Sequence, residues 1–223
     1  EGYKTEDARD YGILSTEEII SKSSNVGMVK LCANLNPNEI LQTYYSLGLG
    51  KYMNEIFIPT REGYLPEFKD LSLREKVSLC YGYGLQTTLV QLISAYSTIF
   101  SEGSYRPLKL IKNSSKFEEE RILNEEDAEN IKNILYQSIK NGTGFRAKVK
   151  HHDVFGKTGT ARIFKNEKYN DDLHNALFIG MTKLENKEYL IGLFVKNPRL
   201  NGDGGGDVAA PIFSEIIETI QKF

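Results

Sequence analysis

The sequence lacks several features that mark particular classes of protein. Its formal net charge is only −2, so it has no basic surplus of the kind that nucleic-acid-binding or membrane-surface proteins carry. Its longest apolar run, residues 189–195, is far too short to cross a bilayer. No stretch resembles a signal peptide and the chain begins with Glu1, so we expect a processed or truncated piece of a longer protein.

Cysteine and histidine are also scarce, with 2 and 3 copies. Cys32 and Cys80 each lie in an apolar pattern typical of buried positions, so we expect two core thiols rather than a disulfide. The run 151–153 (His-His-Asp) and the distant His174 have no metal-ligand spacing, and we expect solvated loop residues there. The sequence therefore predicts neither a metal site nor a cofactor.

What remains is an ordinary globular composition with a helix-rich first part. The 223 residues, 40% hydrophobic and 26% charged, suffice for one large domain or two small ones. Capping residues and apolar residues at helical spacing predict a succession of helices. These helices are expected after Ser15, over 26–35, after Asn36-Pro37, over 73–79, after Thr88 and after Asn124. Between them we expect a surface loop over 51–70 and an edge strand over 105–112.

The later part of the chain changes to the alternating pattern of strands. We expect strands over 154–164, 175–184 and 188–196, with the last two joined by the three residues 185–187 as a hairpin. A glycine-rich turn over 202–207 then leads to a final helix that has Pro211 in its first turn. The sequence thus predicts an α/β (α+β) fold, an antiparallel sheet with helices packed on it.

The first of these strands carries the most unusual composition. Lys157, Thr158, Gly159 and Thr160 place a charge, two hydroxyls and a glycine in one strand. A glycine inside a strand often marks the close approach of a ligand or of another backbone. These residues are candidates for holding an anionic, peptide-like ligand, while the alternative is a tight turn with a solvated lysine.

A second polar motif, Ser23-Ser24-Asn25, interrupts the helical pattern near the start of the chain. On a non-helical turn, Ser23 and Asn25 can face the same cleft, which a regular helix would not allow. The alternative is an ordinary cap at a helix break, because serine and asparagine bond readily to nearby backbone.

In this order, Ser-x-Asn and Lys-Thr-Gly resemble the second and third motifs of the penicillin-recognising serine acyltransferases. Flanking segments narrow the resemblance to class B penicillin-binding proteins, most closely the septal, division-specific type (penicillin-binding protein 3 type). Those segments are 22–27, 47–51, 81–84, 141–144 and 205–213. The resemblance runs from about Tyr11 to the final helix. It implies a transpeptidase or serine β-lactamase-like fold with a helical subdomain, in which residues 1–223 form the C-terminal portion of a single domain.

One departure from this family stands out. Its first motif is Ser-x-x-Lys, whose serine is the nucleophile, and no serine of this chain has a lysine three positions later. We therefore expect the nucleophile upstream of Glu1 and an isolated chain that is inactive. The missing motif keeps open a non-catalytic β-lactam sensor or a degenerate binding module.

The resemblance assigns roles to six residues. Ser23 matches the serine that relays a proton, and Asn25 matches the residue that orients the motif-one lysine and holds the substrate amide. Lys157 matches the charge that supports that serine and attracts the substrate carboxylate. Thr158 and Thr160 match hydroxyls that bind this carboxylate, and the amide of Thr160 matches an oxyanion donor. Gly159 leaves room for the acyl donor to lie along the strand.

The function implied by the resemblance is that of a peptidoglycan D,D-transpeptidase. Its substrate would be a stem peptide ending in D-Ala-D-Ala, β-lactams would trap its acyl-enzyme, and no nucleic-acid partner is expected. The family implies a periplasmic or extracytoplasmic domain anchored in the inner membrane, beside a glycosyltransferase of the division machinery. A D,D-carboxypeptidase and a serine β-lactamase share the motifs and are the enzymatic alternatives.

Overall fold

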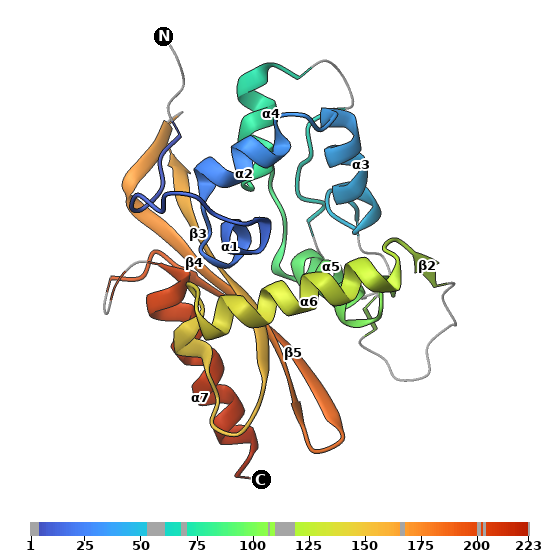
Figure 1. Cartoon of the computed structure of the whole chain (residues 1–223), viewed down its shortest axis with the longest axis vertical. Helices are drawn as coiled ribbons and strands as arrows, with labels where there is room; N and C mark the ends of the chain where they lie inside the picture. Colours follow the sequence, from blue (N-terminus) through green and yellow to red (C-terminus); the bar gives the residue numbers. More distant parts are fainter. Residues whose placement is uncertain are drawn as a thin grey trace. The chain divides into compact units, whose positions relative to one another are not determined.

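The structure is a computed structural model that describes residues 5–52, 61–67, 71–106, 108–109, 119–165, 168–199, 202 and 204–222 (Figure 1). The chain divides into two compact units, Glu1–Asn130 and Ile131–Phe223, and the boundary falls within helix α6 (Glu125–Lys140). Helices and an antiparallel sheet are both present, which confirms the predicted α/β fold class. Within the described part of the chain, no helix has the length and apolarity that a bilayer crossing requires.

The first unit is mainly helical, and helices in it begin directly after predicted capping residues. Its helices are α1 (Thr16–Ser21), α2 (Asn25–Cys32), α3 (Pro37–Ser46), α4 (Leu73–Cys80) and α5 (Leu89–Phe100). Ser15 and Thr88 each form the predicted N-terminal cap, and both belong to capping boxes in which the third helical residue bonds back to the cap. Each box satisfies amide groups that a helix leaves open at its start.

The apolar residues of α5 at helical spacing predict its buried face, and the observed buried face differs from it. These apolar residues are Leu89, Leu92, Ile93, Tyr96, Ile99 and Phe100. The fully buried residues of α5 include Gln91 and Ser94, whereas the predicted apolar positions of this helix are only partly buried. The Gln91 amide donates to the carbonyl oxygens of Lys51 and Glu62 at 2.7 and 2.8 Å. Carbonyl groups that are shielded from water require hydrogen-bond donors. The amide of Gln91 supplies them, which explains why a polar side chain is fully buried in α5.

The two cysteines are free and buried in this unit, which confirms the predicted core thiols. Burial and the neighbouring Cys80 thiol raise the pKa of Cys32 to about 12. The predicted edge strand at 105–112 is shorter where it is described. Strand β1 covers Ser104–Tyr105 and pairs with β2 (Glu120–Arg121), whereas residues 107 and 110–118 lie outside the described residues, as do 53–60 and 68–70 of the predicted loop.

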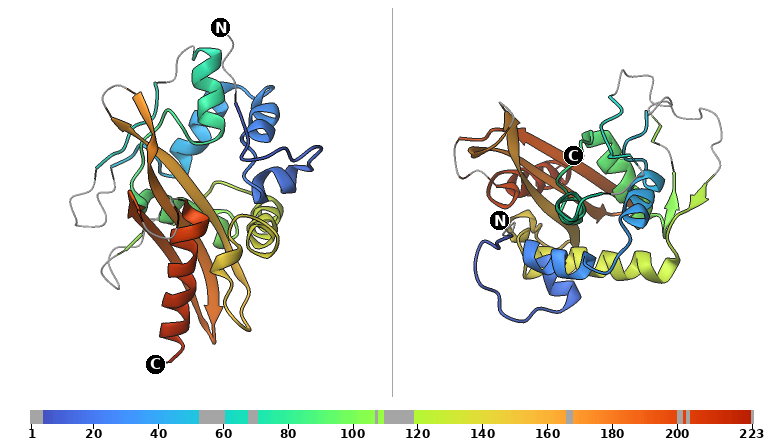
Figure 2. Two further views of the ribbon diagram at one scale, coloured as in Figure 1. Left: turned by 90° about the vertical axis from the view of Figure 1, so that its left-hand side faces the viewer. Right: turned by 90° about the horizontal axis from the view of Figure 1, so that it is seen from above.

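The second unit is built on a three-stranded antiparallel sheet in the order β3-β4-β5 (Figures 1 and 2). The strands are β3 (Val154–Lys165), β4 (Lys168–Leu184) and β5 (Lys187–Lys196). Strand β4 begins seven residues before the predicted start at Asn175, because Lys168 pairs with Lys165 and extends the β3–β4 ladder. The β4–β5 turn is shorter than predicted, since Lys187 pairs with Leu184.

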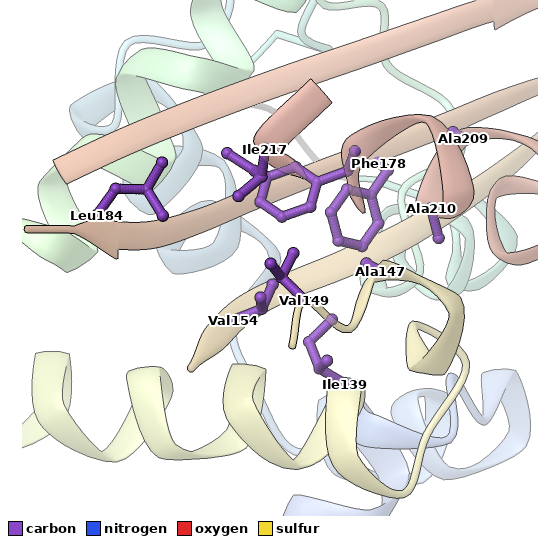
Figure 3. Close-up of a cluster of buried hydrophobic side chains, with 10 residues drawn as sticks. Ile139, Ala147, Val149, Val154, Phe178, Leu184, Ala209, Ala210 and Ile217 are labelled. Atoms are coloured by element: carbon purple, nitrogen blue, oxygen red, sulfur yellow. The ribbon is translucent and has the colours of Figure 1, made fainter. Parts of the chain in front are cut away.

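After β5, the predicted turn at 202–207 is replaced in part by a turn of π-helix, η3 (Gly205–Ala209), which runs into α7 (Ala210–Ile220). Helix α7 lies along one face of the sheet (Figure 2). There the rings of Phe178 and Phe213 are 5.1 Å apart. Figure 3 shows the buried cluster that joins the end of α6, the short 3₁₀ turn η2 (Phe145–Ala147), the sheet and α7. This core holds β3, which carries four of the candidate residues, against η3.

Candidate functional site

The Ser-x-Asn motif forms the break between α1 and α2. Ser23 has a positive φ of 58°, in the left-handed region, which ends α1 and turns the chain into the next helix. Ser24 is buried and is the N-cap of α2, where its hydroxyl accepts from the Gly27 amide at 2.8 Å. Ser23 and Asn25, on either side of it, are exposed. The middle serine thus performs the capping role, and the outer two side chains are presented to solvent.

Asp7 holds this break in place. Its carboxylate accepts from the Ser24 hydroxyl at 2.7 Å and from the Val26 amide at 3.1 Å. A carboxylate at a helix N-terminus is favourable because open amide groups point toward it. The Asn25 side chain also donates to the Glu6 carbonyl at 3.4 Å. The segment before α1 is therefore part of the architecture of the motif.

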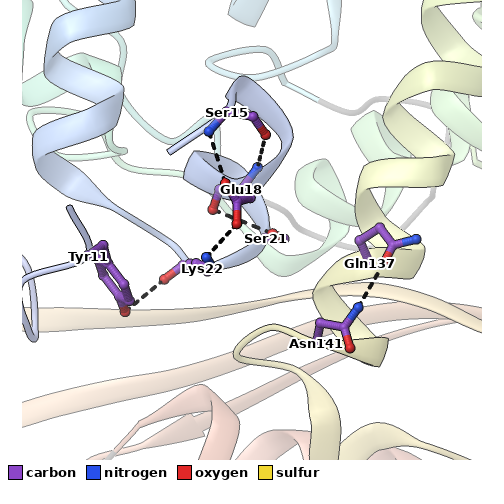
Figure 4. A network of polar contacts seen from close by, with 7 residues as sticks. All are labelled: Tyr11, Ser15, Glu18, Ser21, Lys22, Gln137 and Asn141. Atoms are coloured by element: carbon purple, nitrogen blue, oxygen red, sulfur yellow. Dashed lines mark hydrogen bonds and ion pairs between the residues drawn. The ribbon is translucent and has the colours of Figure 1, made fainter. Parts of the chain in front are cut away.

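Further polar contacts hold α1, the helix that precedes Ser23 (Figure 4). Glu18 accepts from the Ser15 amide at 3.1 Å and from the Lys22 ammonium at 2.6 Å, and the carbonyl of Lys22 accepts from the Tyr11 hydroxyl at 3.3 Å. Lys22 is the C-cap of α1. The residue directly before Ser23 is thus held from both its backbone and its side chain.

The Lys-Thr-Gly-Thr motif lies in the middle of β3, within the second unit. Lys157 pairs with Ile179 and Thr158 with Phe178, so the two side chains lie on opposite faces of the sheet. Thr158 and Thr160 share the face on which Phe178 meets α7. Among the described strands, β3 is hydrogen-bonded to β4 alone. The motif therefore lies at an edge of the described sheet.

Lys157 has the most strongly perturbed amine in the described part of the chain. Burial lowers the pKa of its ammonium from 10.5 to about 8, because removal from water disfavours the charged form. Its Nζ donates to the Thr158 carbonyl oxygen at 3.2 Å. An amine whose pKa lies near neutral pH in a strand with a ligand-like composition is typical of a functional site.

The hydroxyls of Thr158 and Thr160 both form hydrogen bonds with residues outside β3. The Thr158 hydroxyl lies 2.7 Å from the hydroxyl of Thr143, and the Thr160 hydroxyl accepts from the Gly205 amide at 3.0 Å. Gly205 packs directly on β3, since a Cβ there would lie 2.5 Å from the Gly159 carbonyl oxygen. Two segments that are far from β3 in sequence therefore support the same short stretch of strand.

Gly156 and Gly159 of β3 differ in how closely the rest of the fold approaches them. A Cβ at Gly156 would lie 2.7 Å from the Phe178 ring, so this glycine makes room for the core rather than for a ligand. A Cβ at Gly159 would have Leu177 Cβ as its nearest neighbour, at 3.4 Å. Packing within the fold therefore requires glycine at 156 but not at 159, which leaves Gly159 as the candidate for close approach by a ligand.

The six candidate residues fall into two local groups. Ser23 and Asn25 lie together at the α1–α2 break of the first unit, and the Lys157–Thr160 group lies on β3 of the second. Sequence reasoning gave no role to Asp7, Thr143 or Gly205. The only signals for the last two were a threonine between glycines at 141–144 and the glycine run before α7. In the described residues, no three His, Cys, Asp or Glu side chains gather as metal ligands would.

Residues 1–218 match the family model described as the penicillin binding protein transpeptidase domain. Among curated proteins, the "Probable peptidoglycan D,D-transpeptidase PenA" of Neisseria gonorrhoeae is 34% identical over 212 residues, which are 95% of this chain and 36% of that protein. The "Peptidoglycan D,D-transpeptidase FtsI" of Escherichia coli K12 is 29% identical over 217 residues, 97% of this chain and 37% of its own length. The chain thus spans little more than a third of these two relatives.

Two solved structures of penicillin-binding proteins also match nearly the whole of this chain. The TP domain of penicillin-binding protein 3 from Burkholderia pseudomallei superposes with a TM-score of 0.88 at 29% identity, covering 97% of this chain and 66% of that one. Penicillin-binding protein 3 from Mycobacterium tuberculosis, complexed with ampicillin, has a TM-score of 0.86 at 27% identity and covers 98% of this chain and 53% of that one.

Proposed function

Since the chain belongs to the penicillin-binding protein transpeptidase family, we propose that it forms part of a peptidoglycan D,D-transpeptidase of the septal type. The full-length enzyme would attack a stem peptide at its penultimate D-Ala, release the terminal D-Ala and pass the acyl group to the amine of a neighbouring stem. β-Lactams would acylate the same nucleophile. Both compact units would belong to one transpeptidase domain, and its Ser-x-x-Lys segment would lie upstream of Glu1 in the full-length protein.

The observation that supports this function most is the arrangement on β3. A half-buried lysine with a pKa of about 8, two hydroxyls and a glycine that packing does not require stand in four consecutive positions. A ligand strand that binds along a sheet edge gains backbone hydrogen bonds. Because Lys157 and the two threonines lie on opposite faces of β3, a ligand carboxylate would be reached along the edge of the strand, by the ammonium from one face and by the hydroxyls from the other. This is the recognition that a peptide ending in D-Ala-D-Ala requires.

The acyl-transfer step needs an activated serine, a path for its proton and donors for the oxyanion. We assign the proton path to Ser23 and the holding of the substrate amide to Asn25, both of which are exposed at the α1–α2 break. Lys157 supplies the positive charge, Thr158 and Thr160 bind the terminal carboxylate, and the amide of Thr160 is one oxyanion donor. The second donor would be the amide of the nucleophilic serine.

The place of action follows from the proposed reaction. Because stem peptides are cross-linked outside the cytoplasm, the domain would be periplasmic or extracytoplasmic, held at the inner membrane by an upstream helix. Its substrate would come from a glycosyltransferase that polymerises lipid II, and we propose such an enzyme of the division machinery as a partner.

The test is an assay of the full-length protein with a synthetic stem pentapeptide. The proposal predicts release of free D-alanine together with formation of a cross-linked dimer when an amine acceptor is present. Release of D-alanine without dimers would indicate a D,D-carboxypeptidase. A folded full-length protein that neither releases D-alanine nor has a Ser-x-x-Lys upstream of Glu1 would be a non-catalytic binding module, and the proposal would fail.

A further inference from the structure

The two cysteines lie at equivalent places in two neighbouring helices. Cys32 is the last residue of α2 and Cys80 is the last residue of α4, and these helices pack against each other (Figure 1). Both thiols are free in the structure, and only 6% of each residue is exposed. The Cys32 thiol forms a side-chain hydrogen bond with the Cys80 thiol. The two sulfur atoms are therefore immediate neighbours, and the proposed acyl-transfer chemistry uses neither of them.

A hydrogen bond between residues next to the cysteines holds the two helix ends together. The ammonium of Lys76, one turn before Cys80 in α4, donates to the carbonyl oxygen of Ala33 at 2.8 Å. Ala33 directly follows Cys32 and is the C-cap of α2. The open carbonyl groups at a helix C-terminus are favourable acceptors for a cation. A direct contact between the helices thus sets how the backbone at 32 lies relative to the backbone at 80.

A third helix, α3, also contacts the pair. The hydroxyl of Tyr44 in α3 donates at 2.8 Å to the carbonyl oxygen of Leu79, the residue before Cys80. Burial raises the pKa of Tyr44 to about 12, and negative charge on Cys32 or Cys80 acts in the same direction, so the phenol lies close to both thiols. The two thiols are therefore surrounded by α2, α3 and α4.

We propose that Cys32 and Cys80 form a disulfide site, at which the two thiols are oxidised to a bond that joins α2 to α4. The oxidant is a small molecule or protein that carries a disulfide. One cysteine thiolate attacks this disulfide, which gives a mixed disulfide and releases one thiol of the oxidant. The second cysteine thiolate attacks the protein sulfur of the mixed disulfide and releases the other thiol. Two S–H bonds of the protein and one S–S bond of the oxidant are thus exchanged for one S–S bond of the protein and two S–H bonds of the reduced oxidant.

The burial of the pair predicts when this bond forms. In the folded chain burial raises the pKa of Cys32 to about 12, so oxidants, like alkylating agents, react slowly with the reduced folded chain. In an unfolded chain both thiols are accessible, with an ordinary pKa of about 8.5. The disulfide therefore forms while the chain folds, and burial then protects it from reductants. The proposed location outside the cytoplasm is a compartment in which disulfides form and persist.

The test is to refold the reduced, urea-unfolded full-length protein in a glutathione redox buffer, with dithiothreitol in a parallel sample. N-ethylmaleimide then blocks free thiols, and mass spectrometry detects peptides joined through Cys32 and Cys80. We expect the joined peptides in the oxidising buffer only. Closing a loop of about 50 residues restricts the unfolded chain, so the urea midpoint of the oxidised protein should be roughly 1 M higher. The matched variants Cys32→Ser and Cys80→Ser should have the same midpoint in both buffers.

Three results would overturn the proposal. N-ethylmaleimide on both cysteines after refolding in the oxidising buffer is one, and glutathione bound to either cysteine without a bond between them is another. A disulfide that leaves the urea midpoint unchanged is the third. If the full-length protein does not refold, the same blocking is applied to protein extracted from its cells directly into urea, where the joined peptides support the proposal and two blocked thiols refute it. The redox buffer supplies the oxidant, so the refolding result does not depend on the proposed function, which D-alanine release tests separately.

Discussion

The burial of Lys157 gives a stability prediction that can be tested on this chain alone. Its pKa is about 8 in the folded chain against 10.5 for an unperturbed lysine. Between these values the unfolded state holds more protons than the folded state, so the free energy of unfolding rises with pH through this window. Below pH 8 both states are protonated, and the contribution of Lys157 is constant.

The magnitude follows from the same two pKa values. Between pH 7 and 9.5 they correspond to a gain of at most about 2 kcal/mol, an upper value because partial exposure of the side chain reduces the effect. Lys157→Met removes the titrating group and should remove this gain. Urea denaturation followed by circular dichroism at pH 7, 8, 9 and 9.5 measures it.

A matched control is Lys183→Met, which removes an exposed lysine from strand β4 of the same sheet. The control should keep the pH dependence of the wild type. The difference between wild type and Lys157→Met isolates the contribution of Lys157 from that of all other groups. If the two proteins change in parallel from pH 7 to 9.5, the account of Lys157 as a buried amine is wrong.

Three further predictions concern folding. Gln91→Leu removes the donor to two loop carbonyls at 2.7 and 2.8 Å and should lower the free energy of unfolding by roughly 2–4 kcal/mol, measured by urea denaturation; an unchanged midpoint would contradict this. Gly205→Ala places a Cβ 2.2 Å from the Leu177 carbonyl oxygen and should lower the free energy of unfolding by more than about 2 kcal/mol. Gly159→Ala should stay within about 1 kcal/mol of the wild type, because its Cβ meets no close neighbour. Similar losses of stability in the two variants would refute the packing argument. Cys32, with a pKa of about 12, should resist iodoacetamide at pH 8 until urea unfolds the chain, and mass spectrometry counts the modified thiols.

Local chemistry explains the parts of the fold that the sequence predicted well. Ser15 and Thr88 cap their helices because each is followed three residues later by Glu or Gln, and this interaction needs no distant partner. The alternation over 188–196 places β5 within one residue of its start. The start of β4 was missed because Lys168 pairs through its backbone with Lys165, a contact that side-chain hydrophobicity does not encode.

In the candidate site, too, some residues could be predicted from the sequence and others could not. The Ser-x-Asn and Lys-Thr-Gly-Thr motifs were found because each is contiguous in sequence. The contacts of Asp7 with Ser24 and of Thr143 with Thr158 join residues 17 and 15 positions apart, and no spacing rule predicts them. The contact between Gly205 and Thr160 spans 45 positions and depends on how α7 packs on the sheet. Supporting residues of this kind become visible only in the folded chain.

The central claim, that Lys157 and Ser23 serve one acyl-transfer reaction, is tested most directly by the rate at which a fluorescent penicillin acylates the full-length protein. The account predicts a covalent adduct in the wild type and rates at least roughly 100-fold lower in Lys157→Ala and in Ser23→Ala, with Lys183→Ala unchanged. Labelling of both site variants at the wild-type rate would contradict the account.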